Sequence, residues 1–248
     1  MKISSVLPLI TACLAAGTGS ALTPTVAGHD VDPLNVPLFA KPGQTRLAVA
    51  FGQKGEGAHV NGGIAVSQGV ELLAAGSFAD LNNCPSCNIS ERRHIEVGFG
   101  AYAVNPETGR IREIAAGVAQ GRFRMSGAVP NFDPEAQEMR VTASDYREVF
   151  LQADLGRRFK WIDRAGSIRL AGYRYEKSSL VDGNGLALPM AKSAWGVYLE
   201  PAYSFRVGYK GMKVDTQWGL SLPVLQPEGF GNNLVWASLG LGFDLFTL

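Results

Sequence analysis

The sequence predicts an all-β fold, a closed antiparallel transmembrane β-barrel of about ten strands, and three observations support it. From Arg46 onward, apolar residues occupy every second position over stretches of roughly 8–14 residues. The connectors between these stretches alternate between short and long. The chain also opens with an export signal. Together these features predict short periplasmic turns and longer external loops.

Composition excludes several other classes of protein. The chain has 248 residues, with 23 Lys and Arg against 22 Asp and Glu, and this balance provides no basic excess for binding nucleic acid. After the N-terminus, no run reaches the ~18 apolar residues of a transmembrane helix, which excludes a multi-helix membrane protein. Aromatic and β-branched residues are plentiful, which argues against a disordered chain. Glycines interrupt nearly every stretch, and each would cost a helix about 1 kcal/mol relative to alanine.

Residues 1–21 have the layout of a signal peptide. A positive start at Lys2 precedes an apolar region and then small residues up to Ala21, where ordinary cleavage would fall. The run 10–13 alternatively matches a bacterial lipobox, in which Cys13 becomes the lipidated first residue. Residues 22–44 are rich in proline and lack periodicity, so we interpret them as an extended periplasmic lead-in, followed by the barrel over 45–248.

The first five stretches each present an apolar face opposite polar or small residues. His59 and Asn61 oppose the second of these faces, and His94 and Glu96 oppose the fourth. The apolar faces, in chain order, are Leu47, Val49 and Phe51; Val60, Ile64 and Val66; Val70, Leu72, Ala74 and Phe78; Ile95, Val97, Phe99, Ala101 and Ala103; and Ile114, Ala116 and Val118.

The last five stretches include the clearest alternation and one irregular member. In the seventh, Ser167 to Glu176, Ile168 and Leu170 point one way and Tyr173 and Tyr175 the other, which predicts a bulge or an interfacial switch. The other four apolar faces are Val149, Leu151, Ala153 and Leu155; Trp195, Val197, Leu199, Pro201, Tyr203, Phe205 and Val207; Met212, Val214, Thr216, Trp218, Leu220 and Leu222; and Val235, Ala237, Leu239, Leu241, Phe243 and Leu245. If the first or seventh stretch does not span, the barrel has eight strands.

A membrane barrel explains these stretches better than a soluble exported β-sandwich, the rival fold. About ten residues at a tilt cross a bilayer, whereas sandwich strands are usually nearer five or six. Lipid offers backbone groups no partners, so an all-β chain in a membrane must close on itself. Aromatics near the strand ends, such as Trp161, Trp195, Tyr209, Trp236 and Phe246, predict interfacial girdles.

Two short segments resemble known outer-membrane proteins. The C-terminal run 238–245, with Gly240, Phe243 and Leu245 at its defining positions, resembles the assembly signal of outer-membrane β-barrels, although three residues follow it. The lipobox together with the runs 35–39 and 41–43 resembles an uncharacterised family of small bacterial outer-membrane barrels within the porin-like and OmpA-like superfamily. The resemblance implies the bacterial outer membrane as location and the barrel-assembly machinery as a partner, beside outer-membrane lipid.

Charged residues on the polar faces predict a network inside the lumen. Neighbouring opposite charges, such as Glu200 with Arg206 and Lys213 with Asp215, suggest that the charges pair and largely fill a narrow interior. The predicted lumen network comprises His59, His94, Glu96, Asp154, Glu200, Arg206, Lys213, Asp215 and Asp244.

The cysteines and histidines provide the remaining candidates for chemistry. Cys84 and Cys87 form a C-x-x-C in an external loop, and because no helix follows, we interpret them as a local disulfide. Ser90 and Glu91 lie near His94, but no known catalytic motif matches. The acidic loops lack the ligand spacing of a calcium site, and neither a metal nor a cofactor is expected.

These observations lead to three hypotheses about function. The first is a structural or binding role through the external loops, without enzymatic activity and for an unidentified external ligand. The second is a narrow passive channel or porin. The third is an outer-membrane hydrolase using His59 or His94.

Overall fold

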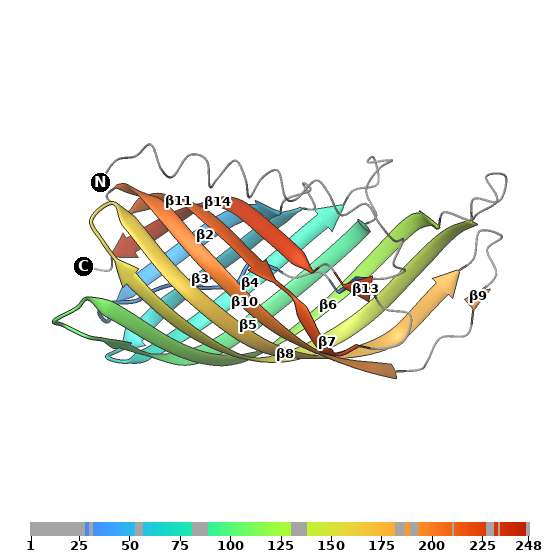
Figure 1. The fold of residues 1–248 in the computed structure, drawn as a ribbon, viewed down its shortest axis with the longest axis horizontal. Helices are drawn as coiled ribbons and strands as arrows, with labels where there is room; N and C mark the ends of the chain where they lie inside the picture. Colours follow the sequence, from blue (N-terminus) through green and yellow to red (C-terminus); the bar gives the residue numbers. More distant parts are fainter. Residues whose placement is uncertain are drawn as a thin grey trace.

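Ten strands close into one antiparallel barrel in the computed structural model, which describes residues 28–29, 32–52, 57–80, 89–129, 138–181, 187–188, 193–209, 211–226, 231–232 and 234–246 (Figure 1). The barrel strands are β2 (Gln44–Gly52), β3 (Ala58–Ser67), β4 (Val70–Asp80), β5 (Ile89–Val104), β6 (Arg110–Val129), β7 (Glu138–Arg158), β8 (Ile162–Val181), β10 (Ser193–Tyr209), β11 (Met212–Leu220) and β14 (Val235–Phe246). The predicted fold class is therefore confirmed, with ten strands rather than eight.

Closure comes from pairing between the first and last barrel strands. Gln44 of β2 lies opposite Phe246 of β14, and each strand in between pairs antiparallel with its chain neighbour. A closed barrel leaves no unpaired edge, which is the condition for placing a sheet in lipid. The end that holds Gln44 and Phe246 is the periplasmic end, and the opposite end is external.

Four short strands lie outside this cycle. They are β1 (Gly28–His29), β9 (Ala187–Leu188), β12 (Leu222–Leu225) and β13 (Gly231–Asn232). Strand β12 continues β11 along β10 beyond Ser221, whose N–H donates to the carbonyl of Leu234. Strand β1 pairs in parallel with β13 at the external end. In the described part of the chain no helix is long and apolar enough to cross a membrane.

The alternation of side chains divides each strand between the outer wall and the lumen. Ile95, Val97 and Phe99 point outward and are 53–66% exposed, while His94 and Glu96 on the same strand are buried inside. An apolar outer face and a polar inner face are the arrangement expected of a barrel in a bilayer.

The irregular seventh stretch is part of the regular strand β8. From Ile162 to Glu176 its register with β10 is uninterrupted, so the bulge predicted between Ser167 and Glu176 is wrong. Tyr173 and Tyr175 simply occupy inward positions and are buried in the lumen. Because both faces of this strand carry apolar or aromatic residues, the two-residue period could not be recognised in the sequence.

Aromatic residues mark both ends of the outer wall. At the periplasmic end, Trp161 stacks on Tyr209 with ring centroids 4.3 Å apart. Trp195 is exposed near the external end. Trp236 does not belong to this girdle, because it is only 6% exposed and faces the lumen. The side chain of Phe246 lies outside the described residues.

The barrel wall is much taller on one side. Strands β6, β7 and β8 have 20, 21 and 20 residues, whereas β2 has nine. Twenty residues tilted by about 45° rise about 45 Å, which exceeds the ~30 Å hydrocarbon layer. The tall side therefore projects beyond the bilayer at the external end. In Figure 1 the green and yellow strands reach further than the blue ones at the end away from the C-terminus.

Candidate functional site

Residues 32–40 run through the inside of the barrel without regular secondary structure, and we call them the plug segment. The segment is buried from Pro33 to Phe39. Leu34, Asn35, Leu38 and Phe39 are each 1% exposed. The described part of the predicted lead-in thus occupies the lumen of the barrel that follows it.

Side chains from the wall hold the backbone of the plug segment. The Leu34 N–H donates to Oε1 of Gln217 over 2.6 Å, and Nε2 of the same amide donates to the Leu34 carbonyl over 3.1 Å. The Phe39 N–H donates to Glu113 over 2.7 Å. Gln152 donates to the carbonyl of Asn35, 2.9 Å away. Buried backbone groups need partners, and lumen side chains provide them in place of a strand.

The plug segment also bonds to the backbone of the wall through a side chain of its own, that of Asn35. Nδ2 of Asn35 donates to the carbonyls of Gly62 on β3 and Ala74 on β4, at 2.6 and 3.2 Å. The guanidinium of Arg206 donates to the carbonyl of Val36. These contacts tie the segment to strands on several sides of the wall.

Apolar packing also fixes the plug segment between Leu34 and Leu38. Leu34, Val36 and Leu38 pack with Ile111 and Trp236 in one buried cluster. Leu38 adopts a left-handed backbone conformation, with φ of 57°, which is unfavourable for a branched residue. Its side chain fits against Gly156, where any Cβ would overlap it.

An ion-pair network fills the lumen at the periplasmic end. Arg46 bonds both Asp215 and Asp244, at 2.7 and 2.8 Å. Asp215 also accepts from Arg206 over 3.0 Å. Lys213 donates to Asp163 on β8.

The pairs predicted from sequence proximity are not the pairs formed. Arg206 bonds Asp215 rather than Glu200, because six residues along a strand separate two side chains by about 20 Å. Lys213 bonds Asp163 of another strand instead of Asp215. Both corrections have the same cause, since the nearest lumen neighbours of a residue come from nearby strands and not from its own strand.

A second network lies at mid-height around Arg169 of β8. Its guanidinium forms a bidentate pair with Glu96, at 2.7 and 3.2 Å, and also donates to Gln152. Glu148 is 3.7 Å away. The guanidinium lies 4.2 Å from the ring centroid of Phe150. The positive charge of the buried Arg169 is thus balanced by Glu96 and Glu148, and its N–H groups have hydrogen-bond acceptors.

At the external mouth, Asp32 of the plug segment contacts three basic side chains of the wall. Its carboxylate is 2.6 Å from Nδ1 of His59, 2.7 Å from Arg92 and 3.7 Å from Nε2 of His94. Burial raises the pKa of Asp32, but its contacts with Arg92, His94 and His59 outweigh that effect and hold the pKa well below its usual value. Asp32 therefore remains a carboxylate at neutral pH.

His94 is held at one ring nitrogen and faces carboxylates with the other. Nδ1 is 2.8 Å from the Tyr146 hydroxyl. Nε2 lies 3.7 Å from Asp32 and 3.9 Å from Glu96, beyond hydrogen-bond length in both cases. A histidine with one oriented nitrogen beside an acid has the arrangement of a general base.

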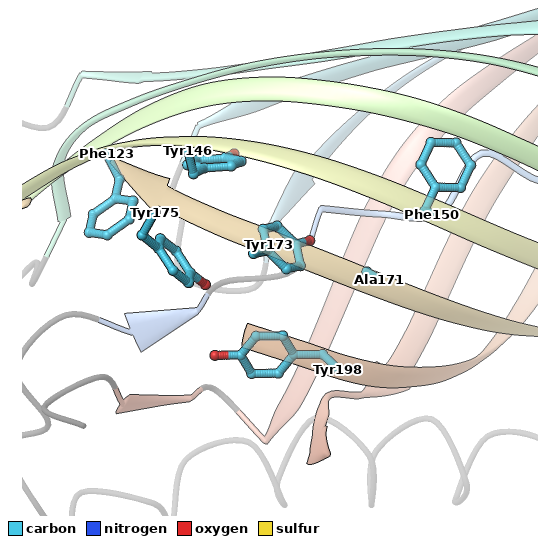
Figure 2. Close-up of a cluster of buried hydrophobic side chains, with 7 residues drawn as sticks. All are labelled: Phe123, Tyr146, Phe150, Ala171, Tyr173, Tyr175 and Tyr198. Carbon is cyan, nitrogen blue, oxygen red and sulfur yellow. The ribbon is translucent and has the colours of Figure 1, made fainter. Parts of the chain in front are cut away.

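Aromatic side chains cover the inner wall next to this histidine. They come from β6, β7, β8 and β10 and are drawn in Figure 2: Phe123, Tyr146, Phe150, Tyr173, Tyr175 and Tyr198, with Ala171. Tyr146 lies over Gly121, where a Cβ would overlap its ring. Four tyrosines in one wall combine apolar surface with hydroxyl groups, a composition typical of binding sites.

The structure places every residue of the predicted lumen network on the inside of the barrel. His59, His94, Glu96, Asp154, Glu200, Arg206, Lys213 and Asp244 are at most 9% exposed, and Asp215 is partly buried. Only His59, His94 and Glu96 meet near the mouth, and the charges from β11 and β14 lie at the periplasmic end. Glu91, proposed beside His94, instead pairs with Arg93 on the outer wall.

Other predicted features lie outside the described residues or remain predictions. Cys13, Cys84 and Cys87 belong to undescribed segments, as does the signal peptide 1–21. Gly240, Phe243 and Leu245 lie on β14, but their role in assembly stays a prediction. Among the residues that the structure describes, no group of three His, Cys, Asp or Glu side chains could hold a metal ion.

Sequence reasoning missed the residues that connect the network. Arg46 and Arg169 follow the inward phase of their strands, so the alternation itself could have identified them. Asp32 has no such signal, because it lies in a segment without periodicity. Tyr146 was missed because the apolar face predicted for its strand began only at Val149.

The fold and the lumen together define the class of protein: this chain is a bacterial outer-membrane β-barrel, filled by its own N-terminal segment. No protein-family model matches the sequence. No curated protein matches it either.

Two solved barrels are similar in fold. The outer-membrane protease OmpT from Escherichia coli is 10% identical, with a TM-score of 0.45, over 82% of this chain and 93% of that one. LpxR from Salmonella typhimurium is 7% identical, with a TM-score of 0.37, over 81% of this chain and 99% of that one. At these identities the likeness concerns the fold alone. A specific family is therefore not assigned.

One prediction is corrected by this comparison. The sequence analysis predicted that the chain is not an enzyme, and that exclusion is wrong, because a barrel of the same kind is a protease. The exclusion had rested on the lack of a known motif, which says nothing about residues that only the folded barrel brings together.

Proposed function

We propose that the protein is a sealed outer-membrane barrel that carries its N-terminal segment through the lumen and works at the external face. The burial of the plug segment from Pro33 to Phe39 is the observation that carries this proposal. The segment is bonded to side chains of β6, β7, β10 and β11. It occupies the space that a solute would need.

The direction of the plug segment supports an external site of action. Phe39 bonds Glu113 near the periplasmic start of β6, whereas Asp32 contacts the external ends of β3 and β5. Before Asp32, Gly28 and His29 pair with Gly231 and Asn232 in the external connection between β12 and β14. The chain thus enters the lumen from outside, and the barrel closes around it.

Surface accessibility tests the direction of threading. An epitope tag inserted between Ala27 and Gly28 is expected to bind antibody on intact cells. A matched control carries the tag after Thr108 in the periplasmic turn, and it binds only after the outer membrane is opened. Equal protection of both tags in intact cells would show that the chain enters from the periplasm and would overturn the proposal.

Planar-bilayer recording separates the sealed barrel from the passive channel. The purified barrel is expected to give no discrete conductance steps, because the plug segment and the ion pairs fill the interior. Stepwise conductance by the full chain would instead support the channel hypothesis. A general binding role through the external loops stays a prediction, since most of those loops lie outside the described residues.

A second candidate function is hydrolysis at the mouth of the lumen, and the geometry of His94 favours it. His94 is oriented by Tyr146 and directs Nε2 towards Asp32 and Glu96. A water molecule held there would lose a proton to the ring as it attacks a substrate carbonyl. The carboxylate of Asp32, which lies on the Nε2 side of the ring, would stabilise the imidazolium that forms by its negative charge.

Turnover of acyl-ester and peptide probes by the purified barrel tests this candidate. If His94 is the base, His94→Gln lowers kcat by at least about 100-fold. Arg112→Gln, which changes an outward residue at the periplasmic end of the wall, leaves it unchanged. Activity that survives in folded His94→Gln would eliminate the assignment.

A further inference from the structure

Outward-facing arginines form two rows on the tall side of the barrel. Each of β6, β7 and β8 contributes a pair ten residues apart: Arg112 and Arg122, Arg147 and Arg157, Arg164 and Arg174. Strand β6 also carries Arg110 and Arg124, each two residues beyond its pair. Ten residues at a tilt of about 45° rise about 23 Å, close to the ~25 Å apolar band of a membrane barrel. The two rows therefore lie at the two headgroup layers.

The outer surface of the wall between the two rows is apolar, as a surface in contact with lipid tails has to be. Apart from Gln120, its outward residues are apolar or glycine: Ile114, Ala116, Val118, Val149, Leu151, Ala153, Leu155, Gly166, Ile168, Leu170 and Gly172. Above them, β5 adds Arg93 to the external row.

The external row brings like charges face to face. Arg93 lies directly opposite Arg122, and Arg147 directly opposite Arg174. Cross-strand pairs of like charge are destabilising, so an anion shared between them would relieve a cost built into the sheet. These four side chains are 49–71% exposed and reach the surroundings of the wall.

Three carboxylates orient the external row without neutralising it. Asp145 accepts from Arg122 over 2.6 Å, Glu91 lies 3.1 Å from Arg93, and Glu176 lies 3.7 Å from Arg147. Each guanidinium has five N–H donors, so one carboxylate contact leaves donors for a further anion. The four arginines keep one positive charge in excess over the three carboxylates.

The external row also surrounds a hollow in the wall. The hollow has a volume of about 410 Å³ and is lined by Arg93, Arg122 and Arg147, with Ile95 below them and Asp145 and Glu176 beside them. Ligand sites typically measure about 300–1,000 Å³. In the same external row, the guanidinium of Arg174 lies 5.8 Å from the ring centroid of Trp195, at the depth where tryptophan favours the membrane interface.

We propose that this hollow binds the phosphate-bearing headgroup of a lipid in the external leaflet. The planar guanidinium donates two parallel hydrogen bonds to phosphate oxygens, which makes arginine the preferred residue for such recognition. The acyl chains then lie along Ile95, Val118 and Val149, below the arginines. Tight headgroup contacts on the tall side anchor the barrel at a fixed height in the membrane.

Native mass spectrometry of the full-length barrel tests the proposal with phosphatidic acid in phosphatidylcholine micelles as the probe. Each arginine near a membrane surface contributes about a fivefold gain in affinity for anionic lipid, so Arg122→Gln/Arg147→Gln is expected to lower phosphatidic acid retention about 30-fold. Heat-modifiable migration on a gel verifies that each variant is folded.

The periplasmic row provides the matched control. Arg157→Gln/Arg164→Gln removes two outward arginines from the same two-strand region, where both guanidiniums lie over the ring of Phe159. A clearly smaller loss of retention than in Arg122→Gln/Arg147→Gln is expected, because both guanidiniums of the periplasmic pair already cover the ring of Phe159. Equal losses in both double variants would reduce the effect to general charge attraction, and unchanged retention in Arg122→Gln/Arg147→Gln would exclude the site.

Discussion

Asp32 is the residue on which the mouth of the lumen depends. It comes from a segment without periodicity, yet it holds His59 and Arg92 and faces His94, which lie on two different strands. Removing one member of a buried charge group leaves its partners uncompensated, and this is costlier than the net value of the group itself. The strongest single-residue effects are therefore expected here.

Asp32→Asn is expected to destabilise the barrel by about 3 kcal/mol in urea-induced unfolding at pH 7. Asp145→Asn breaks a mostly exposed pair on the outer wall and should cost less than about 1 kcal/mol. If the two variants unfold at the same urea concentration, Asp32 does not hold the mouth together.

The same comparison has a defined pH dependence. Because the folded-state pKa of Asp32 lies well below 3.8, its charge stabilises the fold fully above about pH 4. That contribution is lost as the pH falls through the folded-state pKa. The gap between the unsubstituted barrel and Asp32→Asn should therefore be present at pH 5 and narrow below about pH 4. A gap of the same size at pH 5 and pH 2 would contradict the ion-pair geometry.

Gly121 is the second residue at which a small substitution is expected to destabilise the barrel. A Cβ there would overlap the ring of Tyr146, so Gly121→Ala is expected to displace that ring and destabilise the barrel by about 1–3 kcal/mol. Gly166→Ala is the control, since nothing lies within 4 Å of its Cβ position. Urea unfolding should find the control equal to or more stable than the original chain.

At the scale of elements, the plug segment provides hydrogen-bond partners for polar side chains of the lumen. Its backbone groups take the place of solvent for Gln217, Gln152 and Glu113. Its apolar residues pack against Trp236 inside the lumen. An unstructured stretch of sequence thus becomes one of the best-buried elements.

Trp236 reports whether the plug segment is in place. In a chain whose other three tryptophans, Trp161, Trp195 and Trp218, are replaced by Phe, Val36→Ala/Leu38→Ala is expected to increase quenching by acrylamide, because the packing over the indole is lost. Leu241→Ala, an outward residue of the same strand, should leave quenching unchanged. Equal quenching in all three proteins would place the segment elsewhere.

At the scale of the whole molecule, closure of the sheet determines how the protein behaves in membranes. Carbonate washing is expected to leave it in the outer-membrane fraction, because the apolar band faces lipid all round. Unboiled samples should migrate differently from boiled ones on a gel, since the closed hydrogen-bonded barrel resists the detergent. Release by carbonate without a shift would reassign the alternation to a soluble periplasmic β-fold.

The alternating stretches predicted nearly all of the wall, because lipid on one side and a lumen on the other impose a strict two-residue period. The prediction failed where both faces are apolar, as at Tyr173 and Tyr175, and at Trp236, which was assigned to the girdle but faces inward. In the lumen the sequence identified the inward charges but mispaired them, because partners such as Lys213 and Asp163 lie 50 residues apart.

The sequence by itself determined the fold class, the side of each strand that meets lipid and the charged character of the interior, but it left the strand number open between ten and eight. Local period and composition are enough for these, since each depends on neighbours along one strand. Only the tertiary structure decided that residues 32–40 occupy the lumen, that Asp32 meets His59 and His94, and that arginines of three strands line one hollow. These features depend on the register and closure of the sheet, which bring together residues that no local pattern relates.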